Sequence, residues 1–323
     1  MTRRAEDPGT SGPGAGPIVH GFPHLETVRS SLTALYKRLS YDTVSAFPAS
    51  VLPEQVWIGP EEDVHLGAQR VASAMVAHLR LPRARVIVAF RDMVHAGSVE
   101  LTAGPEYFVE LNSRFKDDRR DIGACLAHEV THVYLHRLGL EYPGVRDNEI
   151  LTDTTSAYLG AGWLLLDAYR EESTVRGDRL VRQALKLGYL TPEEFGYVLA
   201  KRALALGDDI EPWFSSPQAR DAYRAGLARA RDDLRRPPLL GAGWAARRRY
   251  AADRRHAEQV LRAPGVRLAE TRPDGPGYAF ERTGGVLRVS FPCPTCHQRI
   301  RVPVRGRLTA RCGLCRTELE CDT

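Results

Sequence analysis

Apolar residues recur along the first part of the chain with two different periods. A helical period over 24–40 and a stronger one over 62–80 predict two helices, the second ending before Pro82. The period then changes to that of strands, and Gly104-Pro105 is typical of a hairpin-type turn between the last two of them. The expected strands cover 85–90, 98–102 and 106–112. The pattern therefore predicts a small sheet that follows helices.

Helical spacing returns in the middle of the chain. We expect helices over 180–188, 191–206 and 215–235, the last ending at Pro237-Pro238. Thr191-Pro192-Glu193-Glu194 is typical of a helix start, because a threonine cap is followed by proline at the first helical position and by glutamate at the third. Helices and strands together indicate a mixed α and β fold.

One apolar helical run, 122–135, contains the pattern H-E-x-x-H. His128 and His132 are four residues apart, so both imidazoles lie on one face of a helix and can reach one cation. Glu129 lies beside that face, where its carboxylate can accept a proton from a water held by the metal. Zn²⁺ suits such a site because it takes nitrogen and oxygen ligands and keeps one position open for catalysis. The alternative is a pair of histidines on a half-buried helix that bind nothing.

A second motif follows on the next predicted helix, as Asn148-Glu149-Ile150-Leu151-Thr152-Asp153. Together with the first motif it resembles the gluzincin metallopeptidases, the thermolysin-like group, whose H-E-x-x-H is followed by N-E-x-x-[S/T]-D. The resemblance implies Glu149 as the third zinc ligand and Asp153 as the carboxylate that orients a ligand histidine. Glycine and proline in 137–147 turn the chain back, so the second helix can face the first.

The same resemblance implies an α+β, zincin-like metallopeptidase domain, with a small sheet beside the active-site helices. An edge strand of such a sheet can pair with an extended peptide, and 106–112 is our candidate for the edge. His136 continues the four-residue spacing but lies about 12 Å along the helix from His128, too far to share a metal with it. We expect His136 to be partly exposed near the end of the helix.

Four cysteines near the end of the chain indicate a second metal site of another kind. They form the pattern C-x₂-C-x₁₅-C-x₂-C, which is typical of a zinc ribbon, and four thiolates close the coordination shell of a structural Zn²⁺. Two disulfides or a redox pair are the alternatives. Cys125 is expected in the core and Cys321 in an exposed tail. The proposed zinc ligands are Cys293, Cys296, Cys312 and Cys315.

Charge is distributed unevenly along the chain. Residues 1–216 hold 23 basic and 29 acidic side chains, whereas 217–323 hold 22 and 11, giving net charges of −6 and +11 that sum to the overall +5. The basic side chains of the second part are all arginines. They can contact nucleic acid or an acidic protein, or they can simply be solvated.

The N-terminal residues 1–17 are rich in glycine, proline and charge, and we expect them to be disordered. They lack the apolar core of a signal peptide, and no apolar run reaches the ~18 residues that span a bilayer, so we expect a cytoplasmic protein without membrane contact. We expect three further parts: a zincin-like domain, a basic helical or flexible linker, and a zinc ribbon. They cover 18–236, 237–285 and 286–323.

These features together predict a zinc metallopeptidase that acts on a peptide or protein substrate. Two Zn²⁺ ions are expected, one catalytic and one structural, with Glu129 as general base toward the water that the catalytic zinc activates. Tyr142, Tyr158 and Tyr197 are candidates to stabilise the oxyanion, and none is favoured. The alternative is a non-hydrolytic protein that keeps a zincin scaffold and uses the ribbon and the basic tail to dock a partner.

Overall fold

The computed structural model describes residues 4–6, 18–101, 106–176, 179–261, 267–268 and 277–323. The chain forms two compact units. Unit 1 consists of 1–38 and 43–227, and unit 2 consists of 39–42 and 228–323. None of the helices in the described residues has the length and apolar character needed to cross a bilayer.

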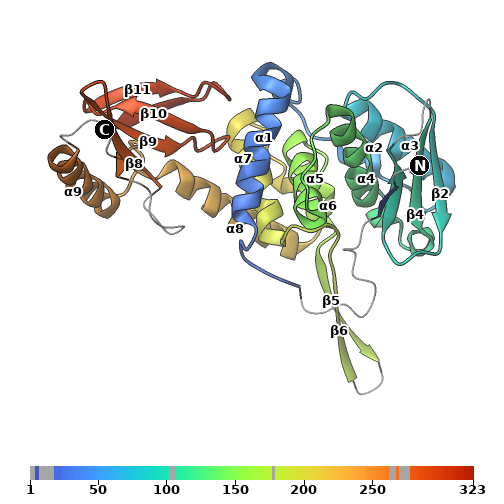
Figure 1. Ribbon diagram of the computed structural model, residues 1–323. Coiled ribbons are helices and arrows are strands. Elements are labelled where there is room, and N and C mark those ends of the chain that lie inside the picture. Colours follow the sequence, from blue (N-terminus) through green and yellow to red (C-terminus); the bar gives the residue numbers. More distant parts are fainter. Residues whose placement is uncertain (1–3, 7–17, 102–105, 177–178, 262–266, 269–276) are drawn as a thin grey trace. The chain divides into compact units, whose positions relative to one another are not determined.

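A four-stranded sheet with the order β1-β3-β4-β2 forms one side of unit 1 (Figure 1). β2 pairs with β4 in parallel, and the other pairs are antiparallel. The prediction that 106–112 is an edge strand was wrong, because β4 is hydrogen-bonded on both sides. Only the parallel pairing with β2, which comes earlier in the chain, places β4 inside the sheet. The strands are β1 (Arg4–Glu6), β2 (Val86–Arg91), β3 (Gly97–Glu100) and β4 (Tyr107–Asn112).

Two parts of the chain assigned from sequence lie largely outside the described residues. The expected turn at Gly104-Pro105 is among them. So is most of the N-terminal segment for which disorder was expected, although Arg4–Glu6 forms strand β1 and pairs with β3. The predicted strands over 85–90 and 98–102 correspond to β2 and β3.

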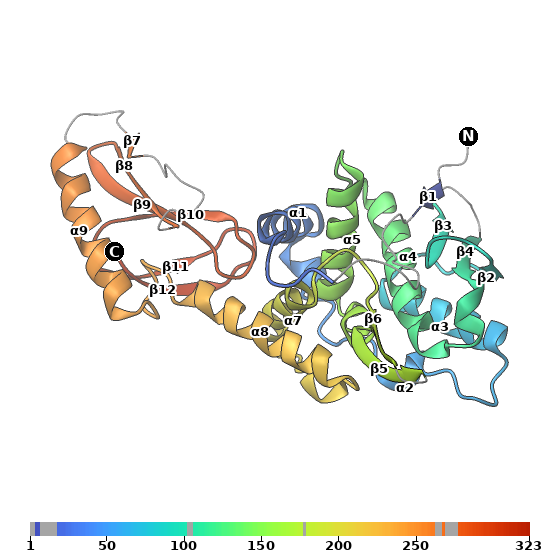
Figure 2. The same ribbon diagram turned by 90° about the horizontal axis from the view of Figure 1, so that it is seen from below.

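Helices cover the sheet and build the rest of unit 1. α3 packs on β2, α4 packs on β3, and α4 lies between the sheet and α5 in both views (Figures 1 and 2). α5 in turn packs on α7. The helices are α1 (Leu25–Val44), α2 (Pro53–Val56), α3 (Val64–His78), α4 (Ile122–Leu138), α5 (Val145–Leu159), α6 (Trp163–Asp167) and α7 (Pro192–Leu206). Single 3₁₀ turns cover 113–116, 119–121 and 211–213.

The prediction of a helix over 180–188 was wrong. β5 (Arg170–Arg176) and β6 (Arg179–Leu185) pair instead as an antiparallel hairpin. The apolar residues of this segment happen to fall at helical spacing, but the hairpin satisfies its backbone groups across the two strands. The start of α7 is as predicted: Thr191 Oγ1 accepts from the backbone N–H of Glu194, and the Glu194 carboxylate accepts from the N–H of Thr191, each at 3.1 Å.

Unit 2 combines two small sheets with a helix. One sheet has the order β10-β9-β8-β7, and β11 pairs with β12 in the other. Tyr250 of helix α9 (Trp244–Val260) packs against the rings of Tyr278 and Phe280, with ring centroids 4.9 and 5.4 Å away. The strands are β7 (Arg267–Leu268), β8 (Ala279–Thr283), β9 (Val286–Pro292), β10 (Arg299–Pro303), β11 (Arg307–Arg311) and β12 (Glu318–Asp322).

Helices α8 (Pro217–Leu234) and α9 (Trp244–Val260) lie in the segments where sequence predicted basic helices. The range 237–285, expected as a linker, contains α9 and also β8, which pairs with β9 of the ribbon. The helix and the strand therefore belong to the packed core of unit 2.

Candidate metal centres

Helix α4 places the H-E-x-x-H residues in the interior of unit 1. Every side chain of α4 from Ile122 to Leu135 is buried, and the helix ends where Gly139 adopts a left-handed conformation. An aspartate directly before a helix is a typical cap, but the side chain of Asp121 makes no cap hydrogen bond. Its carboxylate instead accepts two hydrogen bonds from Arg170, at 2.8 and 3.0 Å. A long-range ion pair therefore takes the place of the local cap.

Three ligand atoms converge from α4 and α5. His128 Nε2 lies 3.0 Å from His132 Nε2, and each of these nitrogens lies 3.1 Å from Glu149 Oε2. All three side chains are at most 5% exposed. Because α5 runs back beside α4, the glutamate of the second motif faces the two histidines. The buried His-His-Glu cluster that both motifs imply is therefore present, and its atoms lie close enough to share one metal ion.

Asp153 fixes the orientation of His128. Its Oδ1 lies 2.8 Å from His128 Nδ1, while its Oδ2 accepts from the backbone N–H groups of Tyr189 and Leu190, at 2.5 and 3.1 Å. The close approach of this backbone requires a glycine, because a Cβ at Gly188 would lie 2.7 Å from Asp153 Oδ2. Gly188 also has a φ of +78°, which favours glycine. A carboxylate can only accept, so Nδ1 of His128 carries a proton.

The Thr152 side chain fixes the orientation of the His132 ring, a role that was not predicted from the sequence. The Thr152 hydroxyl donates to the carbonyl of Asn148 at 3.0 Å, so its oxygen accepts from His132 Nδ1, which lies 3.3 Å away. Nδ1 of His132 therefore carries the proton as well. The signal was present in the sequence, because Thr152 immediately precedes Asp153 in the second motif.

The protonation of both Nδ1 atoms determines what the cluster can bind. In the neutral imidazoles both Nε2 atoms present lone pairs toward a carboxylate oxygen only 3.0–3.1 Å away. Three lone pairs at this distance repel one another unless a cation lies between them. Ligands of a tetrahedral zinc with 2.0–2.1 Å bonds are about 3.3 Å apart, close to these separations. The donor set and its geometry thus fit Zn²⁺.

A proton can replace the metal in this cluster. Burial disfavours the charged form of His128, but hydrogen bonds with Asp153 and Glu149 raise the pKa of His128 well above its usual value. Burial likewise opposes ionisation of Glu149, yet hydrogen bonds with His128 and His132 lower the pKa of Glu149 to about 2. The surroundings therefore favour positive charge at the point where the three ligand atoms meet.

The side chain of Glu129, on α4, packs against strand β3. This side chain is buried, and a Cβ added at Gly97 would lie 2.8 Å from Glu129 Oε1 and 2.7 Å from Cys125 Sγ. Gly97 therefore leaves the space that the carboxylate occupies. Cys125 is buried on the same helix, which confirms its assignment to the core. Gly97 was not singled out from sequence, because nothing local distinguishes it from other glycines.

The remaining candidates make contacts of their own. His136 is half-buried near the end of α4, as predicted, and its Nδ1 lies 2.9 Å from Glu141 Oε1. The hydroxyl of Tyr158 lies 2.8 Å from that of Tyr36 in the core, and the hydroxyl of Tyr197 accepts from Arg29. Tyr142 is half-buried. None of these contacts gives Tyr142, Tyr158 or Tyr197 preference as the oxyanion donor.

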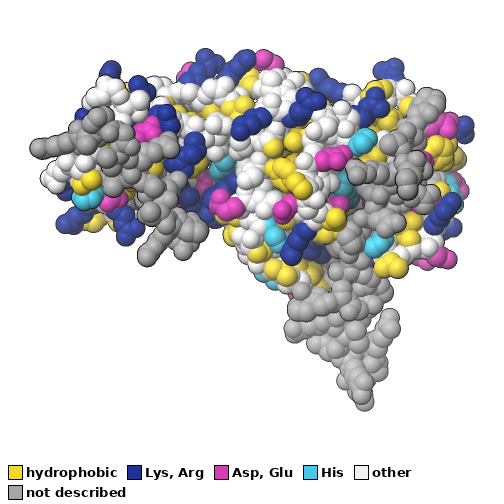
Figure 3. Space-filling view, in the orientation of Figure 1, with side chains coloured by type: hydrophobic (Ala, Val, Ile, Leu, Met, Phe, Trp, Pro, Cys, Tyr) yellow, Lys and Arg dark blue, Asp and Glu magenta, His cyan; other side chains and the backbone are white. Residues whose placement is uncertain are grey.

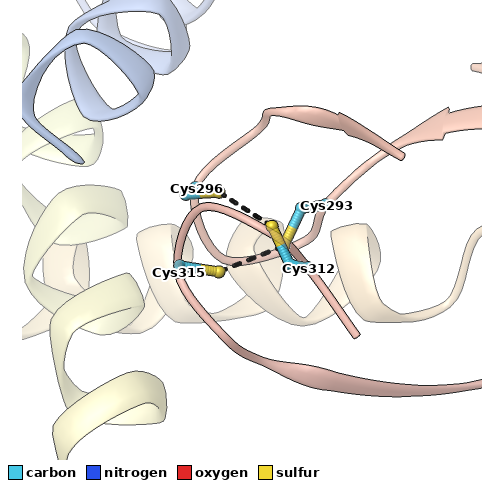
Figure 4. A group of neighbouring side chains, drawn as sticks. All are labelled: Cys293, Cys296, Cys312 and Cys315. Carbon is cyan, nitrogen blue, oxygen red and sulfur yellow. Dashed lines mark hydrogen bonds between the residues drawn. The ribbon is translucent and has the colours of Figure 1, made fainter. Parts of the chain in front are cut away.

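Four cysteines of unit 2 form the second candidate metal centre (Figure 4). Cys293 Sγ lies 3.5 Å from Cys315 Sγ, and Cys296 Sγ lies 3.6 Å from Cys312 Sγ. These separations are far longer than the ~2 Å of a disulfide and close to the roughly 3.8 Å between thiolates on a tetrahedral zinc. All four side chains are buried, and all are free of disulfides. The cluster can therefore hold a closed, structural metal ion.

The two halves of this centre have the same local geometry. In the first knuckle the backbone N–H of Cys293 donates to Gln298 and that of His297 donates to Cys293. In the second, Cys312 donates to Thr317 and Arg316 donates to Cys312. His297 and Arg316 share a φ of +60°, which closes each turn. Two equivalent turns thus each present a pair of thiolates.

The remaining cysteine of unit 2 was assigned wrongly. Cys321 is not an exposed tail thiol: it is fully buried in β12, opposite Leu308 of β11. The chain continues as a strand after the second knuckle, and the alternation of that strand turns Cys321 inward.

Comparison of the chain with family models, with curated proteins and with solved structures gives no match. What the protein does is therefore inferred from the geometry of its own residues.

Proposed function

We propose that this protein is a zinc-dependent metallopeptidase of the gluzincin type. One observation carries the proposal: two imidazole Nε2 atoms and a carboxylate oxygen meet at 3.0–3.1 Å, while Asp153 and Thr152 hold the protons on the opposite nitrogens. Three protein ligands leave the fourth position of a tetrahedral zinc open, as catalytic sites require. His128, His132 and Glu149 are the proposed ligands.

Glu129 is the residue that we propose to move the proton. When bound, zinc supplies Lewis acidity, which polarises the carbonyl of the peptide bond and lowers the pKa of water at the open position. Glu129 follows His128 directly on α4, and its carboxylate packs against Gly97. In the proposed mechanism its carboxylate accepts the proton of the attacking water and later delivers it to the leaving amine.

The cysteine centre has a different proposed role. Four buried thiolates complete the coordination of a zinc ion, so this site holds unit 2 together and has no open position for a substrate. The short strands around the two cysteine turns would gain part of their folding free energy from such a metal. We therefore propose one catalytic and one structural Zn²⁺ per chain.

Metal analysis of variants tests the assignment of ligands. The purified protein is expected to hold two zinc ions. His128→Ala and Glu149→Ala should each lose one and keep the other, whereas Cys293→Ser should lose the zinc that those variants keep. A zinc content unchanged by His128→Ala would contradict the proposed centre.

Peptide hydrolysis tests the function itself. The protein is incubated with a diverse peptide library and the products are identified by mass spectrometry, alongside Glu129→Gln and a chelated sample. Glu129→Gln keeps all three ligands, so it isolates the general base from metal binding. Cleavage that requires both Glu129 and zinc would support the peptidase. If two zinc ions are bound and no peptide is cut, a zincin scaffold used for binding becomes the better explanation.

A further inference from the structure

Helix α9 has an outer face that faces away from the core of unit 2. Tyr250, Ala257 and Leu261 are buried and lie on one side of the helix axis. Residues on the opposite side, at helical spacing from Trp244, are therefore directed outward. We call this the outer face of α9: all its members are exposed, and they are Trp244, Arg248, Ala252, Arg255 and Gln259.

The positive charge of this face is not neutralised. The two acidic residues of α9 contact other side chains: Asp253 accepts from the Tyr278 hydroxyl at 2.7 Å, and Glu258 lies 3.7 Å from Arg254 of the same helix. Within the described part of the chain, no carboxylate forms an ion pair with Arg248, Arg255 or the exposed Arg249 beside them. In Figure 3 dark-blue side chains project around α9.

Other arginines of unit 2 do face carboxylates. On the strand pair β11–β12, Arg307 lies opposite Asp322 and Arg311 lies opposite Glu318. On the sheet beside it, Arg301 forms an ion pair with Glu281. The arginine-rich composition of unit 2 therefore does not give a uniformly basic surface. Among these elements, α9 is where exposed arginines form no ion pair within the described residues.

An aromatic side chain completes the outer face. Trp244 is 75% exposed at the start of α9, and the guanidinium of Arg248, one turn further along, lies 5.4 Å from the centre of the indole ring. An exposed indole flanked by arginines offers a surface on which a base can stack while guanidinium groups contact the phosphates. Bases are available for such stacking only when they are unpaired.

We propose that the outer face of α9 binds single-stranded nucleic acid. Trp244 provides the stacking surface for a base, and Arg248, Arg255 and Arg249 contact the phosphate backbone. Base stacking and phosphate contacts do not read base edges, so the proposed binding tolerates any sequence. The proposal does not depend on peptide hydrolysis, because it involves neither metal centre.

Fluorescence anisotropy with the full-length protein tests this proposal. The probes are labelled oligonucleotides of about 15 nucleotides, as single-stranded DNA, single-stranded RNA and a DNA duplex, because stacking sites of this kind take up roughly 4–16 nucleotides. We expect both single strands to bind more tightly than the duplex. Trp244→Ala should weaken single-strand binding roughly tenfold and leave duplex binding nearly unchanged.

Charge is tested with a matched pair of double variants. Arg248→Gln/Arg255→Gln should weaken binding and make the slope of log K against log salt about 1.4 less steep, at roughly 0.7 per phosphate contact. Arg307→Gln/Arg311→Gln removes the same charge from β11, where carboxylates lie opposite, and should change binding far less. The zinc content and melting temperature of each variant report whether unit 2 remains folded.

Three outcomes would overturn the proposal. The first is equal loss of binding in the two double variants, which would mean that net charge alone attracts the probe. The second is tighter binding of the duplex together with no effect of Trp244→Ala. The third is competition by polyglutamate as strong as by an oligonucleotide of equal charge, which would indicate an acidic protein as the partner.

Discussion

The Nδ1 of His128 on α4 and the Oδ1 of Asp153 on α5 lie 2.8 Å apart in the core of unit 1. They are separated by 25 positions in sequence, and this contact fixes the ring that carries a proposed zinc ligand. The other oxygen of the same carboxylate is held by two backbone N–H groups. The orientation of the ligand is therefore tied to the backbone of the loop before α7.

Replacing Asp153 by asparagine should weaken zinc binding at this centre by about 10- to 100-fold. An amide has one oxygen and one NH₂ group. If its oxygen faces His128, its NH₂ opposes the N–H groups of Tyr189 and Leu190; if it is flipped, it forces the wrong tautomer on His128. Competition with a fluorescent chelator measures the affinity, with the ribbon zinc as internal reference. Equal affinity in Asp153→Asn would show that the contact does not orient the ligand.

Zinc and protons should compete at His128. In the metal-free protein, the raised pKa of His128 gives stability that is complete below its ordinary value of 6.5 and is lost as pH rises through the raised value. The lowered pKa of Glu149 gives stability that is present above 4.5 and is lost as pH falls through about 2. Zinc must displace the proton of His128, so its affinity should fall about tenfold per pH unit below the raised pKa.

Calorimetry between about pH 6 and about pH 8 checks this competition. The gain in melting temperature on adding zinc should increase with pH in the protein. His128→Ala lacks a ligand of the His128–His132–Glu149 centre and should show no such increase. The variant and the unaltered protein should both retain the zinc of the four cysteines. A gain that is independent of pH in the unaltered protein would exclude proton competition at this centre.

Gly97→Ala should reduce hydrolysis without removing zinc. The added methyl group would lie 2.8 Å from Glu129 Oε1 and 2.7 Å from Cys125 Sγ, so the carboxylate must move. A displacement of about 1 Å at a catalytic group costs on the order of a hundredfold in rate. Gly123→Ala on α4 is the matched control, because its methyl group would meet Leu164 and Val56 at an ordinary 3.5 Å. The measurements are kcat and zinc content.

Loss of zinc from Gly97→Ala would contradict this account, since Gly97 contacts the proposed base rather than a ligand. Unchanged kcat with both zinc ions bound would also contradict it, because the carboxylate would then not need its present position.

Cys312→Ser should remove the ribbon zinc and unfold unit 2 while leaving the first centre loaded. Three thiolates bind zinc far more weakly than four, and in the proposed structural role the metal supplies part of the folding free energy of unit 2. We expect one zinc per chain and the loss of one calorimetric transition. The control is Cys321→Ser, a buried cysteine in the same unit that lies outside the cluster, which should retain two zinc ions. Retention of two zinc ions by Cys312→Ser would rule out the four-cysteine site.

Which residues form the two clusters was predictable from the sequence because each depends on short-range geometry. Two histidines four apart share a helix face wherever that helix forms, and each C-x₂-C pair closes one turn. The capping box at Thr191 and the partly exposed position of His136 follow from equally local rules. The resemblance to gluzincins added Glu149 and Asp153, which the fold then brought to the first helix.

Long-range contacts were decided only by the tertiary structure. Two examples are the parallel pairing of β2 with β4 and the Asp121–Arg170 ion pair. Each joins distant segments whose relation leaves no periodic signal in the sequence. The same holds for Gly97 against Glu129 and for the burial of Cys321. Spacing along one element fixes which side chains share a face. The partner of that face depends on how distant elements pack, because packing and charge pairing act through space rather than along the chain.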